Sequence, residues 1–293
     1  MQWPDGFIAV DWGTTNRRAY LLGREGHSAE FEDDRGMMSV EDGGFPAAVA
    51  EIRERLGDLP MLMAGMVGSN RGWVEAPYVP CPAGAEDIAA RLIWPENGRT
   101  AIIPGVSFED GEHADVMRGE EAQIVGAVAA GMVPPDAAIC HPGTHNKWVT
   151  VAAGRIVAFQ TVMTGELFNL LREHSILAPM IDRPAEADDA FRRGVRTGLG
   201  GTALGAELFA IRARVLLGKA DAADAPSYAS GLLIGADLRG GMPDGKDTIH
   251  VVGRPELTGL YAAALSEAGR TWVEVDGEAA FLAGIGRIAE LMR

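Results

Sequence analysis

Two short stretches constrain the fold of this chain more than any other feature of its sequence. VDWGTTNRRA (Val10–Ala19) and CHPGTHNKWV (Cys140–Val149) align without a gap, so that glycine matches glycine, threonine matches threonine and asparagine matches asparagine. Each stretch lies between apolar runs that are typical of strands, which predicts a hairpin turn at each glycine. The glycines, Gly13 and Gly143, are about 130 residues apart, which indicates two related halves.

The residue types in these turns indicate phosphate binding. A glycine lets backbone N–H groups approach a phosphate closely, and neighbouring hydroxyl groups supply further donors. Two such turns facing each other across a cleft would bind a polyphosphate from both sides. An aspartate just before the first turn would bind Mg²⁺ directly or through water. The alternative is a pair of ordinary hairpins. The residues assigned to this site are Asp11 (also the metal ligand), Gly13, Thr14, Thr15, Asn16, Gly143, Thr144, His145 and Lys147.

Strand-like and helix-like segments alternate through most of the chain, which favours an α/β fold. Expected helices include Phe45–Leu56, a helix within Val116–Met132 that begins near Arg118–Glu120, and Thr164–Leu177 with Thr164 as its N-cap. A length of 293 residues suggests about two domains. We expect an N-terminal lobe over residues 1–118 and a C-terminal lobe over residues 119–293, each with one of the two turns.

Composition narrows the class of protein. The formal net charge is −15, which argues against nucleic acid as a partner but allows an anionic small substrate in a locally basic pocket. The two cysteines have no CxxC spacing and indicate neither a zinc site nor a disulfide framework. No run reaches the roughly 18 apolar residues that a membrane span needs. A cytoplasmic protein without membrane partners is expected.

Three acidic residues are candidates for the proton acceptor in phosphoryl transfer. Glu120 and Glu121 open the helix that precedes the second turn, and Asp115 lies just before them. A carboxylate there would accept the proton of a substrate hydroxyl as it attacks phosphorus. The alternative is a solvated helix start whose carboxylates suit the helix dipole.

Several side chains in and beside the loops are candidates for substrate binding. Arg18, Arg71 and Arg118 each lie next to a predicted turn or loop, and arginine binds a carboxylate through a bidentate fork. Trp73 and Glu75 follow in the loop Gly68–Gly84 and would stack on, and hydrogen-bond to, a sugar-like body. Trp73 would equally suit the hydrophobic core.

The sequence resembles the 2-dehydro-3-deoxygalactonokinase family, in order from residue 9 to residue 237. The stretches that carry the resemblance are VDWGTTNRRAYLL, GMVGSNRGWVEAPYVPCPAG, DVMRGEEAQIVGA, PGTHNKWVTVAAGRIVAFQTVMTGELFNLLREHSIL and SGLLIGADL. The resemblance implies the two-lobed fold of sugar kinases, actin and Hsp70, with five-stranded sheets and an active site in the interlobe cleft.

The resemblance also implies a reaction. ATP and Mg²⁺ would serve transfer of the γ-phosphoryl group to the 6-hydroxyl of 2-dehydro-3-deoxy-D-galactonate, a keto-sugar acid of galactonate and galactose catabolism. VVGRPELTGLY is similar to the element that covers adenosine, which places Gly253 there. Sugar kinases of this fold usually have an aspartate base before the second turn, where this chain has Glu120 and Glu121, so Asp11 also remains a candidate base. The alternatives are a kinase of a related keto-sugar acid or a non-catalytic ATP-binding sensor, and a homodimer is possible.

Overall fold

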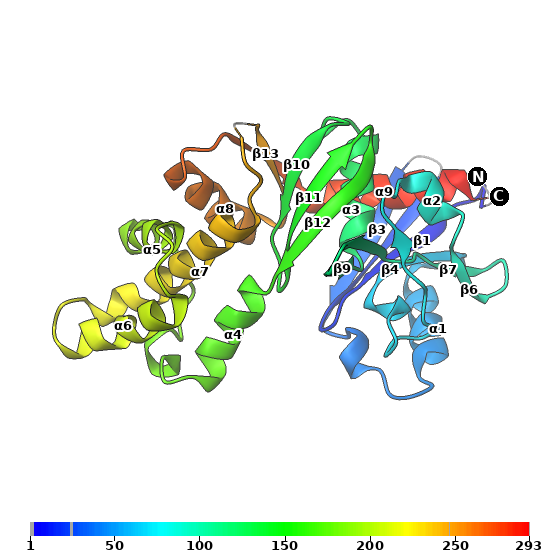
Figure 1. Ribbon diagram of the computed structural model, residues 1–293. Helices are drawn as coiled ribbons and strands as arrows, with labels where there is room; N and C mark the ends of the chain where they lie inside the picture. The colour runs from blue at the N-terminus through cyan, green and yellow to red at the C-terminus, as the bar shows by residue number, and fades with distance from the viewer. Residues whose placement is uncertain (1–2, 24–25, 246, 293) are drawn as a thin grey trace. The chain divides into compact units, whose positions relative to one another are not determined.

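A computed structural model describes residues 3–23, 26–245 and 247–292 of the chain (Figure 1). The chain forms two compact units. The first unit comprises Met1–Pro135, Ala152–Ala158 and Glu278–Arg293, and the second comprises Asp136–Val151 and Phe159–Gly277. The boundary expected at residue 118 therefore falls inside the first unit.

Helix packing explains why the first unit extends beyond residue 118. Helix α3 (Glu120–Ala129) crosses α9 (Gly277–Leu291) so closely that a Cβ on Gly126 would lie 2.0 Å from the carbonyl oxygen of Ala280. The last helix of the chain is thus part of the first unit, which no local pattern in the sequence indicates.

A six-stranded mixed sheet forms the centre of the first unit, with strand order β3-β2-β1-β4-β7-β6. Strands β1, β4 and β7 are parallel, whereas β2, β3 and β6 run antiparallel to their neighbours. A smaller sheet has the order β5-β8-β9. The bounds are β1 Phe7–Trp12, β2 Arg17–Gly23, β3 Gly26–Asp33, β4 Met61–Gly65, β5 Val79–Pro80, β6 Ile93–Glu96, β7 Thr100–Ile102, β8 Val106–Asp110 and β9 His113–Met117, and the short helix α2 spans Ala85–Ala89.

Helix α1 (Phe45–Leu56) has the bounds expected from its apolar spacing. Its buried residues Phe45, Ala48, Val49 and Ile52 form one stripe at helical spacing. This stripe packs against alternate residues of β1, which point to one face of the sheet. The helix ends at Gly57, where φ is 108° and the N–H bonds back to the Arg53 carbonyl. Tyr20 of β2 contacts Phe281 of α9, and α1 and α9 lie on opposite sides of this sheet (Figure 1).

The second unit repeats the topology of the first. Its sheet has the order β12-β11-β10-β13-β14, which corresponds strand by strand to β3-β2-β1-β4-β7. The start of β12, up to Ala158, is counted with the first unit. The repeat therefore extends from the two turns to the sheets, with β6 as an addition to the first. The chain has the two-lobed α/β fold of the actin-like type. The strand bounds are β10 Ala137–His141, β11 Asn146–Ala152, β12 Arg155–Val162, β13 Ile249–Gly253 and β14 Trp272–Asp276.

Helices α5, α7 and α8 pack on this second sheet and complete its core. Glycines bring α5 and α7 into close approach, because a Cβ on Gly231 would lie 2.1 Å from the Phe191 carbonyl oxygen. None of the described helices has the length and apolar character of a membrane-spanning segment. The helix bounds are α4 Thr164–His174, α5 Asp189–Leu199, α6 Leu204–Leu216, α7 Ala225–Gly241 and α8 Pro255–Glu267.

The prediction that Thr164 caps α4 is wrong. Met163 occupies the N-cap position and makes no side-chain cap. The Thr164 hydroxyl instead donates a hydrogen bond of 2.6 Å to the buried carboxylate of Asp237 on α7. A long-range acceptor therefore takes the place of the local capping bond.

Candidate active site

The first Gly-Thr turn connects β1 to β2 in the first unit. The Gly13 N–H donates to the Asn16 carbonyl at 2.9 Å, which closes the turn. The carbonyls of residues 13–15 accept N–H groups of residues 36–38 at distances of 2.8–3.1 Å. A Cβ on Gly36 would lie 2.3 Å from the Thr15 carbonyl carbon, so the segment needs glycine at this approach. The turn is fixed through its backbone, and Thr14, Thr15 and Asn16 are exposed.

The two arginines after this turn have different environments. Arg17 is fully buried and forms a bidentate ion pair with Asp33, at 2.9 and 3.0 Å. Arg18 is partly exposed, pairs with Glu32 at 3.1 Å, and is the cross-strand partner of Asp11. Arg17 therefore stabilises the sheet, and Arg18 is the arginine beside the candidate metal ligand.

The structure brings Asp11, Arg18 and Glu120 together in the first unit. Gly119, just before α3, packs against Gly65 at the end of β4, next to the end of β1. Burial raises the pKa of Asp11 to about 6, Arg18 opposes this shift, and the negative charge of Glu120 adds to it. Two carboxylates that influence each other in this way are suited to bind a cation or to exchange a proton.

The other two candidate bases lie in different surroundings. Glu121 is fully buried, and its Oε2 accepts the Gly119 N–H at 2.6 Å. Burial is the main cause that raises the pKa of Glu121 to about 8, and the negative charge of Glu120 is the second cause. The Glu121 carboxyl is therefore mostly protonated at neutral pH. Asp115 lies on β9 in the three-stranded sheet, where its Oδ1 accepts the N–H of Val116 at 2.7 Å.

The loop after β4 contains the other predicted substrate residues. Arg118 reaches this loop, donates to the Ala76 carbonyl at 2.7 Å and lies over the Tyr78 ring at 4.5 Å. Its Nε and Nη1 are buried and have no hydrogen-bond partner among the described residues. Trp73 stacks on Phe45 with 6.5 Å between ring centroids and packs against the core. The remaining two residues, Arg71 and Glu75, are exposed.

The second Gly-Thr turn connects β10 to β11 in the second unit. The N-terminus of α4 packs against it, since a Cβ on Gly165 would lie 2.5 Å from the Gly143 carbonyl oxygen. The Glu166 N–H donates to the Thr144 carbonyl at 2.9 Å, and the Glu166 carboxylate lies 2.6 Å from His145 Nε2. Because a helix N-terminus favours anions, this turn is suited to bind phosphate.

A buried carboxylate that the sequence analysis missed holds the second turn. Asp237 accepts hydrogen bonds from Asn146 Nδ2 at 3.0 and 3.1 Å, Trp148 Nε1 at 2.7 Å, and the hydroxyls of Thr164 and Tyr261. Burial raises the pKa of Asp237, and these four donors oppose the shift. The sequence did contain a signal for this buried carboxylate, because Asp237 is the one acidic residue in the apolar run SGLLIGADL.

The two turns therefore differ beneath their matched sequences. Asn16 is exposed, whereas its counterpart Asn146 is buried against Asp237. Lys147 is buried, and its Nζ donates to the His145 carbonyl at 3.2 Å. Gly253, at the end of β13, lies beside Pro142 of the second turn, with 3.8 Å from its Cβ position to Pro142 Cδ.

The residues in the first unit suit Mg²⁺ as a cofactor. Mg²⁺ keeps several waters and is usually bound by one or two carboxylates together with substrate phosphates. Asp11, near Glu120, offers such a donor set, and no described side chain donates a hydrogen bond to its carboxylate. Among residues 3–23, 26–245 and 247–292, no group of three or more His, Cys, Asp or Glu side chains forms a protein-only metal site.

Comparisons with known proteins identify relatives along the whole chain. The sequence model of the 2-keto-3-deoxy-galactonokinase family matches residues 11–288. The chain is 38% identical to 2-dehydro-3-deoxygalactonokinase of Escherichia coli (strain K12), over 97% of both proteins. It is 37% identical to a protein of Rhizobium meliloti (strain 1021) named "Probable 2-dehydro-3-deoxygalactonokinase DgoK1", over 97% of this chain and 96% of the relative.

Solved structures agree with these relatives. A crystal structure from Sinorhizobium meliloti, itself assigned as a 2-dehydro-3-deoxygalactonokinase, superimposes with a TM-score of 0.90 at 35% identity. The match covers 97% of this chain and 98% of that one. Component A of (R)-2-hydroxyglutaryl-CoA dehydratase from Acidaminococcus fermentans shares the fold at a TM-score of 0.51 and 11% identity, covering 98% and 99%. The chain belongs to the 2-keto-3-deoxy-galactonokinase family.

Proposed function

We propose that this protein is an ATP-dependent kinase that phosphorylates the 6-hydroxyl of 2-dehydro-3-deoxy-D-galactonate. The observation that carries the proposal is the similarity to the Escherichia coli enzyme, at 38% identity over 97% of both chains. Similarity over the whole length, rather than over one nucleotide-binding segment, favours the same substrate as well as the same chemistry. Kinases of related keto-sugar acids and ATP-binding sensors are not favoured by these relatives.

The two Gly-Thr turns are our proposed phosphate-binding elements. Exposed hydroxyls at Thr14, Thr15 and Thr144 and the backbone N–H group of Gly143 would donate to phosphate oxygens. The Gly13 N–H closes its own turn, so Gly13 would instead let a phosphate approach the backbone closely. The start of α4 adds a favourable dipole at the second turn. Direct phosphate contacts by Asn16, His145 and Lys147, and an adenosine contact at Gly253, stay predictions.

Asp11 is our proposed ligand of Mg²⁺, and Glu120 is our proposed proton acceptor. When bound, Mg²⁺ would neutralise charge on the transferring phosphates. Glu120 is only partly buried, whereas Glu121 is fully buried and mostly protonated at neutral pH. A group that meets the substrate hydroxyl needs access, which favours Glu120 over Glu121. Asp115 and Asp11 remain the rival bases.

Arginines are our proposed binding groups for the substrate carboxylate. Arg118 supports this role because two of its buried guanidinium nitrogens have no partner among the described residues, and an unpaired buried donor is costly unless a ligand satisfies it. Arg18 and Arg71 would add positive charge near the carboxylate of the substrate. Glu75 is exposed and would bond to substrate hydroxyls. Since Trp73 packs against Phe45, it would shape the loop.

Partners and location beyond the small-molecule substrate also stay proposals. We propose a cytoplasmic protein without membrane partners. We also propose that it does not bind nucleic acid, because its net charge is −15 and like charges repel. We also propose a homodimer, which light scattering of the purified chain would test.

The direct test is a coupled assay of ADP release with Mg²⁺-ATP. We expect rapid release with 2-dehydro-3-deoxygalactonate, and much slower release with its gluconate epimer, with galactose and with galactonate. Release with the epimer alone would contradict the substrate assignment. If no acceptor supports release while ATP still binds, the kinase assignment fails.

A change at Asp11 tests the metal site. Asp11→Asn should lower kcat by about 100-fold or more and raise the Mg²⁺ concentration required, because the proposed ligand loses its charge. Steady-state kinetics against Mg²⁺ concentration measure both effects. Near-normal turnover at low Mg²⁺ concentration would show that Asp11 does not bind the metal.

A matched pair of variants tests the base. Glu120→Gln should leave ATP affinity within about twofold but lower kcat by about 10²–10⁴-fold, the usual contribution of a general base. Glu121→Gln is the control, since a mostly protonated carboxyl loses little function when it becomes an amide. Loss of turnover in Glu121→Gln or Asp115→Asn, with Glu120→Gln unaffected, would show that Glu120 is not the base.

A further inference from the structure

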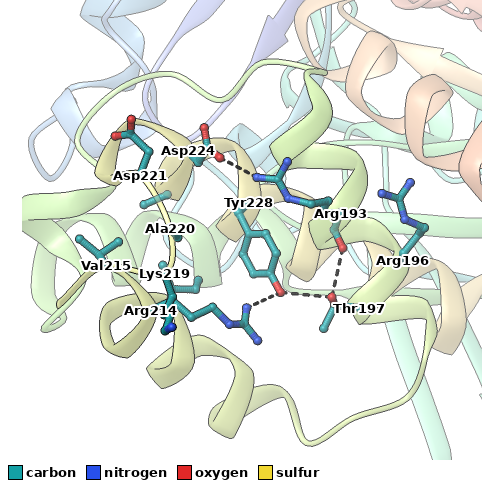
Figure 2. A pocket seen from close by; sticks show the side chains of 12 residues that line it. Arg193, Arg196, Thr197, Arg214, Val215, Lys219, Ala220, Asp221, Asp224 and Tyr228 are labelled. Carbon is teal, nitrogen blue, oxygen red and sulfur yellow. Dashed lines mark hydrogen bonds and ion pairs between the residues drawn. The ribbon is translucent and has the colours of Figure 1, made fainter. Parts of the chain in front are cut away.

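The second unit contains a cavity of about 790 Å³ that none of the predicted kinase residues lines. Helix α5, helix α6, the residues that follow α6, and the start of α7 surround it (Figure 2). A volume of this size is in the range of small-molecule sites. Figure 2 shows the side chains of Arg193, Arg214 and Tyr228 extending from three different helices at this cavity.

The lining of the cavity is positively charged although the chain as a whole is strongly negative. It includes four cationic side chains and two carboxylates, Asp221 and Asp224, in a chain of net charge −15. A local excess of positive charge at a concave surface attracts anions and raises their local concentration. The four cations are Arg193, Arg196, Arg214 and Lys219.

Hydrogen bonds fix part of this lining in place. Arg214 donates to the Tyr228 hydroxyl at 2.8 Å and to Glu207 at 3.0 Å, and the Tyr228 hydroxyl donates to Thr197 at 3.1 Å. On α5, Arg193 pairs with Asp224 at 2.6 Å. A guanidinium has five N–H donors, so one or two partners leave donors for a ligand. Guanidinium groups held in this way suit the oxygens of a phosphoryl group.

The remaining two cations are less constrained. Arg196 is more than half exposed and pairs with Glu267 at 2.7 Å. Lys219 is exposed, and no carboxylate in the described part of the chain pairs with its ammonium group. Each of the three arginines pairs with a carboxylate, whereas the Lys219 ammonium forms no such pair among the described residues and would pair with a bound anion.

We propose that this cavity binds a small organic anion with a dianionic phosphoryl group, such as a phosphorylated sugar acid. The phosphoryl oxygens bond to the arginine and lysine donors, and the uncharged body of the ligand packs beside Tyr228. Arg214 and Arg196 also pair with Glu207 and Glu267, so the guanidinium donors left over, rather than a net charge, favour the several acceptor oxygens of a phosphoryl group over a single carboxylate. This site does not depend on the proposed kinase activity.

Binding to the full chain tests the proposal. The probes are 6-phosphogluconate and inorganic pyrophosphate, with gluconate as the monoanionic control, titrated by calorimetry in the presence of a saturating non-hydrolysable ATP analogue. The analogue occupies the nucleotide site, and the variants described next distinguish the cavity from the proposed substrate site in the first unit. We expect binding of the two phosphorylated probes that weakens as salt concentration rises, and at least about tenfold weaker binding of gluconate.

Variants in the cavity lining, one residue on α5 and one after α6, locate the binding site. Arg196→Gln combined with Lys219→Gln should weaken binding at least about tenfold, since charged hydrogen bonds are lost. Arg192→Gln is the matched control, because Arg192 lies on α5, also pairs with Glu267, and is outside the lining. It should change the affinity less than about twofold.

Four outcomes would overturn the proposal. Probe binding that the ATP analogue abolishes would belong to the nucleotide site. Equal affinities for the double variant and the wild type would show that the probe binds outside the cavity. Equal affinities for gluconate and 6-phosphogluconate would show that the cavity does not select a phosphoryl group. No binding at millimolar concentrations of either phosphorylated probe would remove the site. The replaced side chains are exposed, so circular dichroism should show an unchanged fold.

Discussion

Replacing Asp237 by alanine should destabilise the second unit strongly, although Asp237 is 2% exposed and far in sequence from the turn that it holds. Two of its donors, Asn146 Nδ2 and Trp148 Nε1, are N–H groups that would stay buried without an acceptor. Each unsatisfied buried donor costs about 1–3 kcal/mol, which gives about 2–6 kcal/mol for the pair. The hydroxyls of Thr164 and Tyr261 can turn to other acceptors and add less.

Denaturant unfolding with linear extrapolation would measure this loss. Trp148→Phe removes one donor, so the double variant Asp237→Ala, Trp148→Phe should cost less than the sum of the single variants, by about 1–3 kcal/mol. Asp244→Ala is the control, because Asp244 is exposed after the same helix and its loss should change stability by less than about 0.5 kcal/mol. A loss below about 1 kcal/mol for Asp237→Ala, or strictly additive costs, would refute the reasoning.

Two further predictions concern the first unit. The pKa of Glu121 is raised from 4.5 to about 8 by burial, so the folded state holds a proton that the unfolded chain has released between these pH values. Wild-type stability should therefore fall from pH 5 to pH 8 relative to Glu121→Gln, by up to about 1.4 kcal/mol per pH unit, and parallel unfolding curves would contradict this. Gly284→Ala should lose about 1–3 kcal/mol or more in denaturant unfolding, because its Cβ would lie 1.9 Å from the Ala122 carbonyl oxygen. Gly286→Ala in the same helix has no atom within 4 Å and should gain up to about 1 kcal/mol, so equal effects would show that the helix crossing is not tight.

The sequence predicted elements whose signal is local. Helix α1 has the expected bounds because its apolar stripe and flanking glycines are within one segment. The hairpins at both Gly-Thr turns are also confirmed. Strand β3 was not predicted, because its residues are mostly exposed and lack an apolar alternation.

Features that depend on distant partners could not be predicted in the same way. The pairing of Arg17 with Asp33 and the bonding of Asn146 to Asp237 join residues 16 and 91 positions apart. The sequence shows that Arg17 and Asn146 are polar but not that both are buried. It also shows three acidic candidates for the base, whereas burial separates Glu121 from Glu120.

The two Gly-Thr turns present similar residues but are stabilised by different chemistry. The first turn is fixed by three backbone hydrogen bonds from residues 36–38, which no side-chain replacement at the turn removes. The second turn has a backbone hydrogen bond, from Glu166 to the Thr144 carbonyl, and is also held by the buried Asp237 carboxylate, which accepts hydrogen bonds from β11, α4 and α8. Because a backbone bond has no titratable group, protonation of Asp237 would change only the second turn. If both turns bind the phosphates of ATP, protonation of Asp237 should therefore weaken the second contact, whereas protonation of Asp11, whose pKa is about 6, would act on the metal beside the first.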